Sequence, residues 1–319
     1  MRRVIGPVLT GAAVFLLVTG VLVRFYVAPR LTRAPANVYS VATMRAENAT
    51  YFDPSAARVR TGATVTSTTT VRGVPEAARG NVAVWESFTA TQDLTNGTAL
   101  SYARDRIAFD RTTARLVDCC GAAVDGHRVR MSGIGKFWPM PVEKKDYVLF
   151  DIATRRAWPV AFKGEERVGG LPTYRFEQRV PDTTVPGETP AVPASLLGMK
   201  GDAPVPVERH HQGVATYWIE PRTGAPVDVR QKVRSTLVAK QGTGRLVVAD
   251  MDLRMPDDER RKALSQARDG RRSLLLLTTA APLTCAGLGL VLLVPGLLLG
   301  SGSRSRPQHR QGRRTPAAV

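Results

Sequence analysis

The chain has 319 residues, of which 45 are basic and 27 acidic, so its formal net charge at pH 7 is +18. This length is ample for one folded domain with its own core, or for two small domains. The basic residues are spread thinly, without the dense stripe and interleaved aromatic residues of nucleic-acid binders, and we therefore expect no nucleic-acid partner.

The N-terminus carries two arginines followed by a charge-free apolar run, Val4–Val23, which ends at Arg24. A cleaved signal peptide opens in the same way, but its core usually has roughly 7–15 residues and a small-x-small cleavage site follows it. This run is longer, and no such site precedes Arg24. We predict a retained transmembrane helix over residues 4–26, after a cytoplasmic segment of residues 1–3.

The long middle part of the chain, residues 34–254, is predicted to be one β-rich domain. Its segments are rich in valine, threonine and aromatic residues at alternating positions, which is typical of half-buried strands. The clearest predicted strands are Val59–Val71, Val82–Thr91, Leu100–Phe109, Val214–Ile219, Val227–Val238 and Leu246–Leu253.

A turn unit recurs three times between these apolar segments. Each copy has an acid, Asp110, Asp151 or Glu220, and a threonine downstream of it. Such side chains hydrogen-bond the backbone of tight turns, and Pro221 and Gly224 suit a type I turn closed by a left-handed residue. The fold class is therefore mainly β (α+β): a long antiparallel meander that forms a curved sheet or barrel.

The segment Pro181–Val207 interrupts this pattern with six prolines. We expect a surface loop there, with one helical turn at Pro193–Gly198. After the last predicted strand, a proline and three acids begin a juxtamembrane helix over residues 255–272, because prolines and acids favour the first turn of a helix.

The run Leu274–Leu299 contains no charged residue. It is longer than the roughly 30 Å of bilayer hydrocarbon requires, so we predict a second transmembrane helix over residues 273–300. The tail, residues 301–319, has five arginines and no acid, whereas the charges around the first run are ambiguous. Short segments rich in lysine and arginine next to a transmembrane helix usually lie on the cytoplasmic side of the membrane. We predict a two-pass plasma-membrane protein with both termini cytoplasmic and its main domain extracytoplasmic.

Two stretches resemble a known family. Residues 137–183 read FWPMPVEKKDYVLFDIATRRAWPVAF and then VGGLPTYRFEQRVPDT, and residues 217–229 read YWIEPRTGAPVDV. Together with the flanking apolar runs, they resemble an actinobacterial family of membrane-anchored envelope proteins, a domain of unknown function often labelled "PorA family". The resemblance implies an extracytoplasmic β domain similar to tubular lipid-binding folds and a role in handling envelope lipids or lipoglycans.

The porin label does not fit the physics of a pore. A pore needs many lipid-facing strands of about 9–11 residues, or several helices per subunit, and this chain offers two spans. The resemblance supplies no catalytic motif.

Cys119 and Cys120 are adjacent in the sequence. Neighbouring Cα atoms lie about 3.8 Å apart, below the usual disulfide span, so a vicinal bridge is strained. In an oxidising exterior, a structural vicinal disulfide and free or intermolecular thiols both stay open, and a redox role is less favoured. Cys285 falls in the second apolar run, where it is small and apolar.

Candidate catalytic and metal residues are few. His210 and His211 form the single histidine cluster, with Glu208 as a helper, but a metal usually needs three or four ligands, so we expect solvated loop residues. The pair Asp250 and Asp252 is typical of metal-dependent glycosyl transfer, yet it lies in an alternating segment where both acids would share the polar face. We predict no catalytic residue, no metal and no cofactor.

Aromatic residues gather in the middle domain, and two explanations stay open. Core packing is the default. Alternatively, a curved sheet too wide to fill leaves an apolar channel for acyl chains. The candidate lining residues are Trp85, Phe137, Trp138, Tyr147, Phe150, Trp158, Phe162, Tyr174, Phe176 and Trp218.

The leading hypothesis is a non-enzymatic envelope protein whose β domain binds or passes lipid, or a lipid-linked glycan, at the membrane surface. Its partners would be membrane lipid and envelope-biosynthesis or transport proteins. The first alternative is a ligand-free scaffold or accessory subunit of an envelope synthase or transporter, with a filled core and an exposed apolar patch. The second is an unrecognised hydrolase or transferase, with a polar cleft converging on perturbed acids or on His127, His210 and His211.

Overall fold

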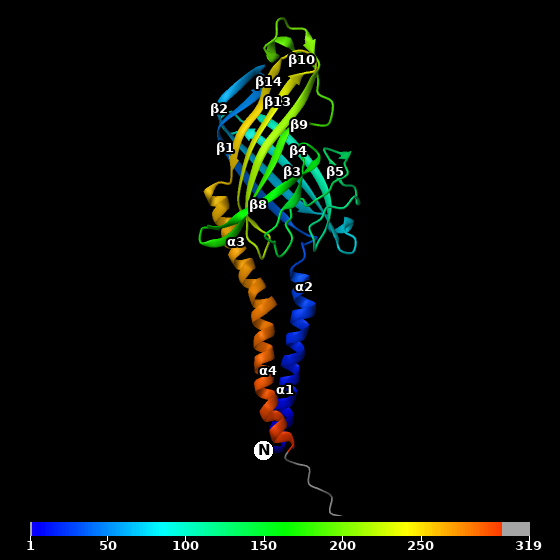
Figure 1. Cartoon of the computed structure of the whole chain (residues 1–319), viewed down its shortest axis with the longest axis vertical. Helices are drawn as coiled ribbons and strands as arrows, with labels where there is room; N and C mark the ends of the chain where they lie inside the picture. The colour runs from blue at the N-terminus through cyan, green and yellow to red at the C-terminus, as the bar shows by residue number, and fades with distance from the viewer. Residues whose placement is uncertain (1, 302–319) are drawn as a thin grey trace, which may run out of the picture. The chain divides into compact units, whose positions relative to one another are not determined.

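The computed structural model describes residues 2–301, which divide into two compact units (Figure 1). One unit is built from the two ends of the chain, up to Leu31 and from Ser273 onward. The other unit, Thr32–Arg272, holds the β-sheet. The fold is mainly β with two long apolar helices at the chain ends, as the sequence predicts.

The unit of the chain ends is helical, and many of its large apolar side chains are exposed. Two helical segments are, by length and composition, long and apolar enough to cross a membrane: Val4–Leu31, and Asp257–Leu299, which begins in the sheet unit. The helical elements are α1 (Arg2–Leu22), η1 (Val23–Val27), α2 (Ala28–Leu31), the end of α3 (Asp257–Leu275), η4 (Leu276–Ala280) and α4 (Ala281–Ser301).

Helices α1 and α4 pack against each other through glycines. A Cβ atom added at Gly289 would lie 2.8 Å from Leu17 Cγ, and one added at Gly296 would lie 2.9 Å from the backbone nitrogen of Thr10. Small residues let helix backbones approach closely in lipid, where van der Waals packing drives association. The close approach of α1 and α4 therefore depends on these glycines.

Replacing Gly289 by leucine should separate the two helices. Spin labels on α1 and α4 of the protein in nanodiscs should report a longer and broader distance than the roughly 8–10 Å spacing of packed helices allows. Gly287→Leu is the matched control, since a Cβ atom there meets nothing within 4 Å. Equal distances in both variants would contradict the glycine-dependent packing.

The sheet unit contains one long antiparallel sheet and a small hairpin of β10 and β11. The strands are β1 (Tyr39–Asp53), β2 (Arg58–Gly73), β3 (Val82–Asp93), β4 (Ala99–Asp110), β5 (Ala123–Val124), β6 (His127–Arg128), β7 (Tyr147–Asp151), β8 (Arg156–Val168), β9 (Leu171–Thr184), β10 (Val192–Pro193), β11 (Pro204–Val205), β12 (Val207–Ile219), β13 (Pro226–Ala239) and β14 (Arg245–Arg254), with short 3-10 helices η2 (Pro75–Ala77) and η3 (Ala194–Leu197).

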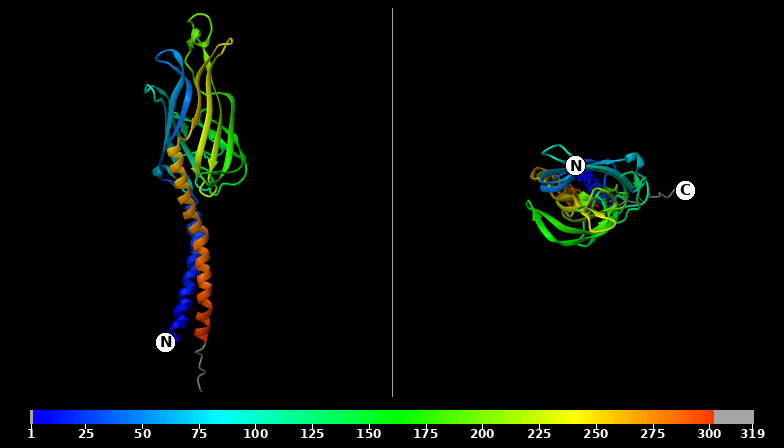
Figure 2. Two further views of the ribbon diagram at one scale, coloured as in Figure 1. Left: turned by 90° about the vertical axis from the view of Figure 1, so that its left-hand side faces the viewer. Right: turned by 90° about the horizontal axis from the view of Figure 1, so that it is seen from above.

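The strand order is β6-β5-β4-β3-β2-β1-β14-β13-β12-β9-β8-β7, so most neighbours in the sheet are also neighbours in the chain. The first and last long strands meet at the centre, where β1 pairs with β14. The sheet is twisted and curled, as the two views in Figure 2 show. Strands do not close it into a barrel. All six predicted strands are present, and the predicted helical turn near residue 195 is the 3-10 helix η3.

At one end of the sheet, isolated β-bridges join its two halves. Phe109 of β4 pairs with Leu116, Arg115 pairs with Ile134, and Ile134 pairs with Leu149 of β7. Backbone hydrogen bonds continue this link, because Ile134 N–H donates to Val148 O and Phe150 N–H donates to Ile134 O. A loop thus connects the halves of the sheet where no regular strand does.

The same loop continues as an inner segment, Gly133–Val142, that lies between the two halves of the sheet. The Phe137 ring is 5.9 Å from Trp85 on β3, and the neighbouring Trp138 ring is 4.7 Å from Phe176 on β9. At the far end of the segment, Val142 N–H donates to Pro221 O. This part of the sheet therefore encloses packed side chains.

Helix α3 is docked on the hairpin ends of the sheet. Its residues Leu264 and Ala267 are buried in a cluster with Leu171 and Val227. The Arg271 guanidinium lies 3.2 Å from the carboxylate of Glu220, which is fully buried. The predicted helix after Pro256 is thus present and begins at Asp257.

Candidate functional site

Acidic residues hold the turns of the sheet, as the three predicted turn units require. Asp110 Oδ1 accepts from the backbone and hydroxyl of Thr113, and Asp151 Oδ1 does the same with Thr154. Glu220 accepts from Thr223 in the same way, and Gly224 is left-handed with φ of 66°. These acids are structural.

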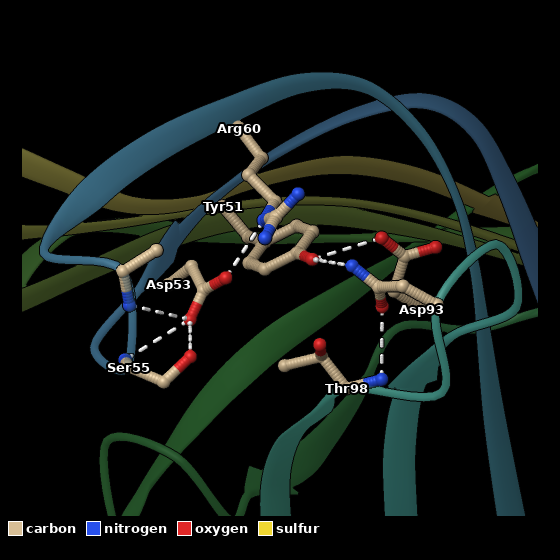
Figure 3. A network of polar contacts seen from close by, with 8 residues as sticks. Tyr51, Asp53, Ser55, Arg60, Asp93 and Thr98 are labelled. Carbon is tan, nitrogen blue, oxygen red and sulfur yellow. Dashed lines mark hydrogen bonds and ion pairs between the residues drawn. The ribbon is translucent and has the colours of Figure 1, made fainter.

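Two further turns use the same device and were not predicted (Figure 3). Asp53 Oδ1 accepts from the backbone and hydroxyl of Ser55, while its other oxygen receives Arg60 Nε at 2.7 Å. Nearby, the buried Tyr51 hydroxyl donates to Asp93 at 2.8 Å. These contacts join residues at the ends of β1, β2 and β3, so the network stabilises the strand ends.

Acidification should weaken this network. Hydrogen bonds from Ser55 and Arg60 lower the pKa of Asp53 to about 2, below its ordinary 3.8. Because the folded-state pKa is the lower one, the stabilisation is complete above about pH 4 and is lost as the pH falls towards about 2. Asp53→Asn should therefore be less stable at neutral pH and lose less stability between about pH 4 and pH 2. Thermal melts over this range would test it, with the exposed Asp257→Asn as control.

A triad of two buried residues, Ser87 and Asp105, with the partly exposed Lys136 is the closest approach to a catalytic arrangement among the described residues. Lys136 Nζ lies 2.7 Å from Asp105 Oδ1 and also donates to Ser87 Oγ. Ser87 Oγ in turn donates to Asp105 Oδ2 at 2.8 Å. A serine nucleophile needs a neighbouring base, but here the ammonium is held by the carboxylate and acts as a donor. The triad is a core ion pair.

The two adjacent histidines lie on strand β12, so their predicted place in a loop is wrong. Because successive side chains of a strand point to opposite faces of the sheet, His210 and His211 lie on opposite faces. His211 Nδ1 lies 3.1 Å from Ser235 Oγ, and burial lowers the pKa of His211. His210 Nδ1 lies 3.1 Å from Asp182 Oδ1. Among the described residues, no group of three or more His, Cys, Asp or Glu is arranged to hold a metal.

His210 borders a groove of about 260 Å³ that crosses β9, β12, β13 and β14. Arg234 Nε approaches Asp250 only to 3.8 Å, and the Arg245 side chain has no hydrogen bond or ion pair within the described part of the chain. The groove thus combines two arginines and a histidine with the carboxylate of Asp182 and with hydroxyl, amide and small apolar groups. Its lining residues are Asp182, His210, Gln212, Arg234, Thr236, Val238, Arg245 and Val247.

Sequence reasoning missed this groove because its members lie on four strands. The outward arginines of β13 follow from its two-residue period, but their neighbours depend on register. Thr236 pairs with Val247 and with His210, and Val238 pairs with Arg245. The groove is the candidate binding site.

The acidic pair on β14 behaves as its alternation predicts. Arg230 makes a two-pronged contact with Asp252, and Arg254 reaches the same carboxylate at 2.9 Å. The hydrogen bond from Arg230 is the main cause that lowers the pKa of Asp252 to about 2. Asp250 faces Arg234. Both acids serve ion pairs along one face of the sheet.

Most of the predicted aromatic lining packs on itself. Trp85, Phe137 and Phe150 belong to a cluster with Phe109, and Trp138 is the centre of a second cluster. The indole of Trp158 donates to Thr154 Oγ1. A ligand-lining role for these residues stays a prediction. Trp218 packs against the cluster that contains Leu264 of α3. The remaining predicted lining residues lie in or against the second cluster: Tyr147, Phe162, Tyr174 and Phe176.

Cys119 and Cys120 are joined as a vicinal disulfide in the structure. The carbonyl of Cys120 accepts from Arg106 Nε at 3.0 Å, and Cys120 has a left-handed φ of 58°. The pair therefore forms part of the connection after β4. Cys285 is a free, half-buried thiol on α4.

Comparison with known proteins identifies the family. The chain is 24% identical over 253 residues to porin PorA of Corynebacterium amycolatum. The matched region covers 62% of this chain and 64% of that protein. It is 21% identical over 280 residues to porin PorA of Corynebacterium resistens, covering 64% and 68% of the two chains. The chain thus spans less than two thirds of the first relative's length. A family model described as "Porin PorA" matches residues 5–298, and the chain belongs to this family.

Proposed function

We propose that this protein is a non-enzymatic, membrane-anchored envelope protein whose β domain binds the polar, anionic part of a lipid-linked glycan. The groove that contains Arg234 and Arg245 is the observation that carries this proposal. Arginine suits carboxylate and phosphate groups, and threonine and glutamine match sugar hydroxyls as donors and acceptors. The packed aromatic clusters favour this polar site over an acyl channel.

Charge reversal in the groove tests the proposal. Full-length protein purified in native nanodiscs should carry a glycolipid in native mass spectra, and Arg234→Glu/Arg245→Glu should lose at least about ten-fold of it. The control, Lys163→Glu/Arg167→Glu, changes the charge equally on exposed positions of β8 and should retain it. A wild-type protein free of glycolipid, or equal retention in both variants, would overturn the proposal.

A channel is the second candidate, because the family and both relatives are named as porins. The sheet does not suit a lipid-facing wall, since charged residues such as Arg230, Lys232 and Asp252 line its surface. A pore would therefore need the apolar helices of several chains. Single-channel recording in planar bilayers distinguishes the two functions: conductance that the groove variant leaves unchanged would favour the channel.

We further propose that both termini are cytoplasmic and the β domain is extracytoplasmic, on the charge argument from the tail. A reporter enzyme that is active only in the cytosol should work when fused after Val319. Activity of an export-dependent reporter at the same position would reverse this orientation.

A further inference from the structure

The outward face of β1 to β4 carries an unpartnered aromatic surface. Phe88 and Tyr102 are 47% and 65% exposed, and their rings lie 5.8 Å apart with planes within 17° of parallel. Soluble surfaces rarely leave large apolar side chains grouped without a function. The opposite face of the same strands is the buried one, with Trp85, Ser87 and Asp105.

Strand register defines the rest of this surface. One row across the sheet runs from Val41 through Thr70 and Phe88 to Arg104, and the next row runs from Thr68 to Tyr102. We call these six residues the aromatic platform: Val41, Thr68, Thr70, Phe88, Tyr102 and Arg104.

The platform is positively charged. The side chain of Arg104 has no hydrogen bond or ion pair within the described part of the chain, although its backbone N–H donates to Asp125. The neighbouring Arg106 is neutralised by Glu86 at 2.9 Å. A free guanidinium beside exposed rings is complementary to a ligand that carries negative charge. It also opposes pairing with a second copy of this chain, whose net charge is +18.

We propose that the aromatic platform binds an anionic polysaccharide. Sugar rings place their C–H faces on flat aromatic rings, their hydroxyl groups match the threonines, and a carboxylate or phosphate substituent pairs with Arg104. A stable protein partner would need about 1,000 Å² with an apolar centre. Here the apolar side chains are few and lie beside threonines and Arg104, which favours a narrow glycan chain. This platform lies on different strands from the groove and its binding does not depend on the groove.

Carboxymethyl-dextran and unmodified dextran are matched probes that differ only in charge. Full-length protein in nanodiscs, at physiological ionic strength, should bind labelled carboxymethyl-dextran more tightly than dextran. Phe88→Ala/Tyr102→Ala should weaken this binding at least about ten-fold, and because the double variant keeps the net charge, the loss cannot be electrostatic. Leu94→Ala, another exposed apolar side chain beyond β3, should bind as wild type does. The groove variant Arg234→Glu/Arg245→Glu, with the Lys163→Glu/Arg167→Glu control for net charge, should retain platform binding.

Three results would overturn the proposal: no binding by the wild type, equal affinity of the double variant, or equal affinity for neutral dextran. Sedimentation of the same samples adds a fourth, since a change in self-association on Phe88→Ala/Tyr102→Ala would make the surface an interface between copies. Thermal melts establish that the variants are folded, which the exposure of both rings leads us to expect.

Discussion

Trp138→Ala should lower the free energy of unfolding of the β domain by about 3–5 kcal/mol, the usual cost of removing a large buried aromatic side chain. Trp138 is only 3% exposed, and its ring lies 4.7 Å from Phe176 and 5.6 Å from Tyr147. Through these contacts Trp138 packs the inner segment against strands β7 and β9. Urea unfolding followed by far-UV circular dichroism, on the full chain in nanodiscs, measures the change.

Tyr102→Ala is the control for this experiment, since its ring is largely exposed and its loss should cost no more than about 0.5 kcal/mol. The comparison also separates the two explanations for the aromatic residues. Packed side chains leave a cavity when one is removed, whereas the lining of an open channel loses few contacts. A Trp138→Ala variant within about 1 kcal/mol of wild type would therefore favour the channel.

How far the sequence predicts this fold depends on how local the signal is. Alternation of apolar and polar residues predicts β2, β3 and β4, because each strand has one buried and one exposed face. Alternation does not predict strand β1. Its register shifts between Arg45 and Thr50, and Asn48 has a left-handed φ of 56°. A bulge of this kind breaks the two-residue period from which strands are recognised.

Turns show the same limit. The units at Asp110, Asp151 and Glu220 are recognisable because a threonine follows each acid at the same spacing. Asp53 and Asp93 differ only in that the first partners are Ser55 and Thr95, two positions on. The chemistry is identical, so a pattern that allows both spacings would have found all five.

The candidate sites are beyond local reasoning. The groove brings His210 and Arg245 together only because β12, β13 and β14 pair in one particular register. The inner segment has no helical or strand period, and its burial follows from the two halves of the sheet that surround it. Glu220 is predicted as a turn acid, but its ion pair with Arg271 depends on where α3 docks.

Lys136→Met should destabilise the β domain by about 3 kcal/mol, because it leaves the carboxylate of Asp105 buried without its counter-ion. Asp105 is 3% exposed, and the hydrogen bond from Ser87 alone cannot replace a full positive charge. We take the lower end of the range measured for broken buried pairs, since the Lys136 side chain retains 29% exposure. Urea unfolding of the full chain provides the measurement.

Two further variants make this result specific to the ion pair. Lys144→Met removes a lysine from an exposed pair with Glu165 and should cost no more than about 1 kcal/mol. The double variant Lys136→Met/Asp105→Leu removes both charges, and it should regain at least half of the lost stability, because apolar replacements of buried pairs are often neutral. The contrary outcome is a double variant that is as unstable as Lys136→Met. The loss of stability would then come from lost packing of the aliphatic part of the Lys136 side chain. In that case the triad would not be an electrostatic link between the inner segment and strands β3 and β4.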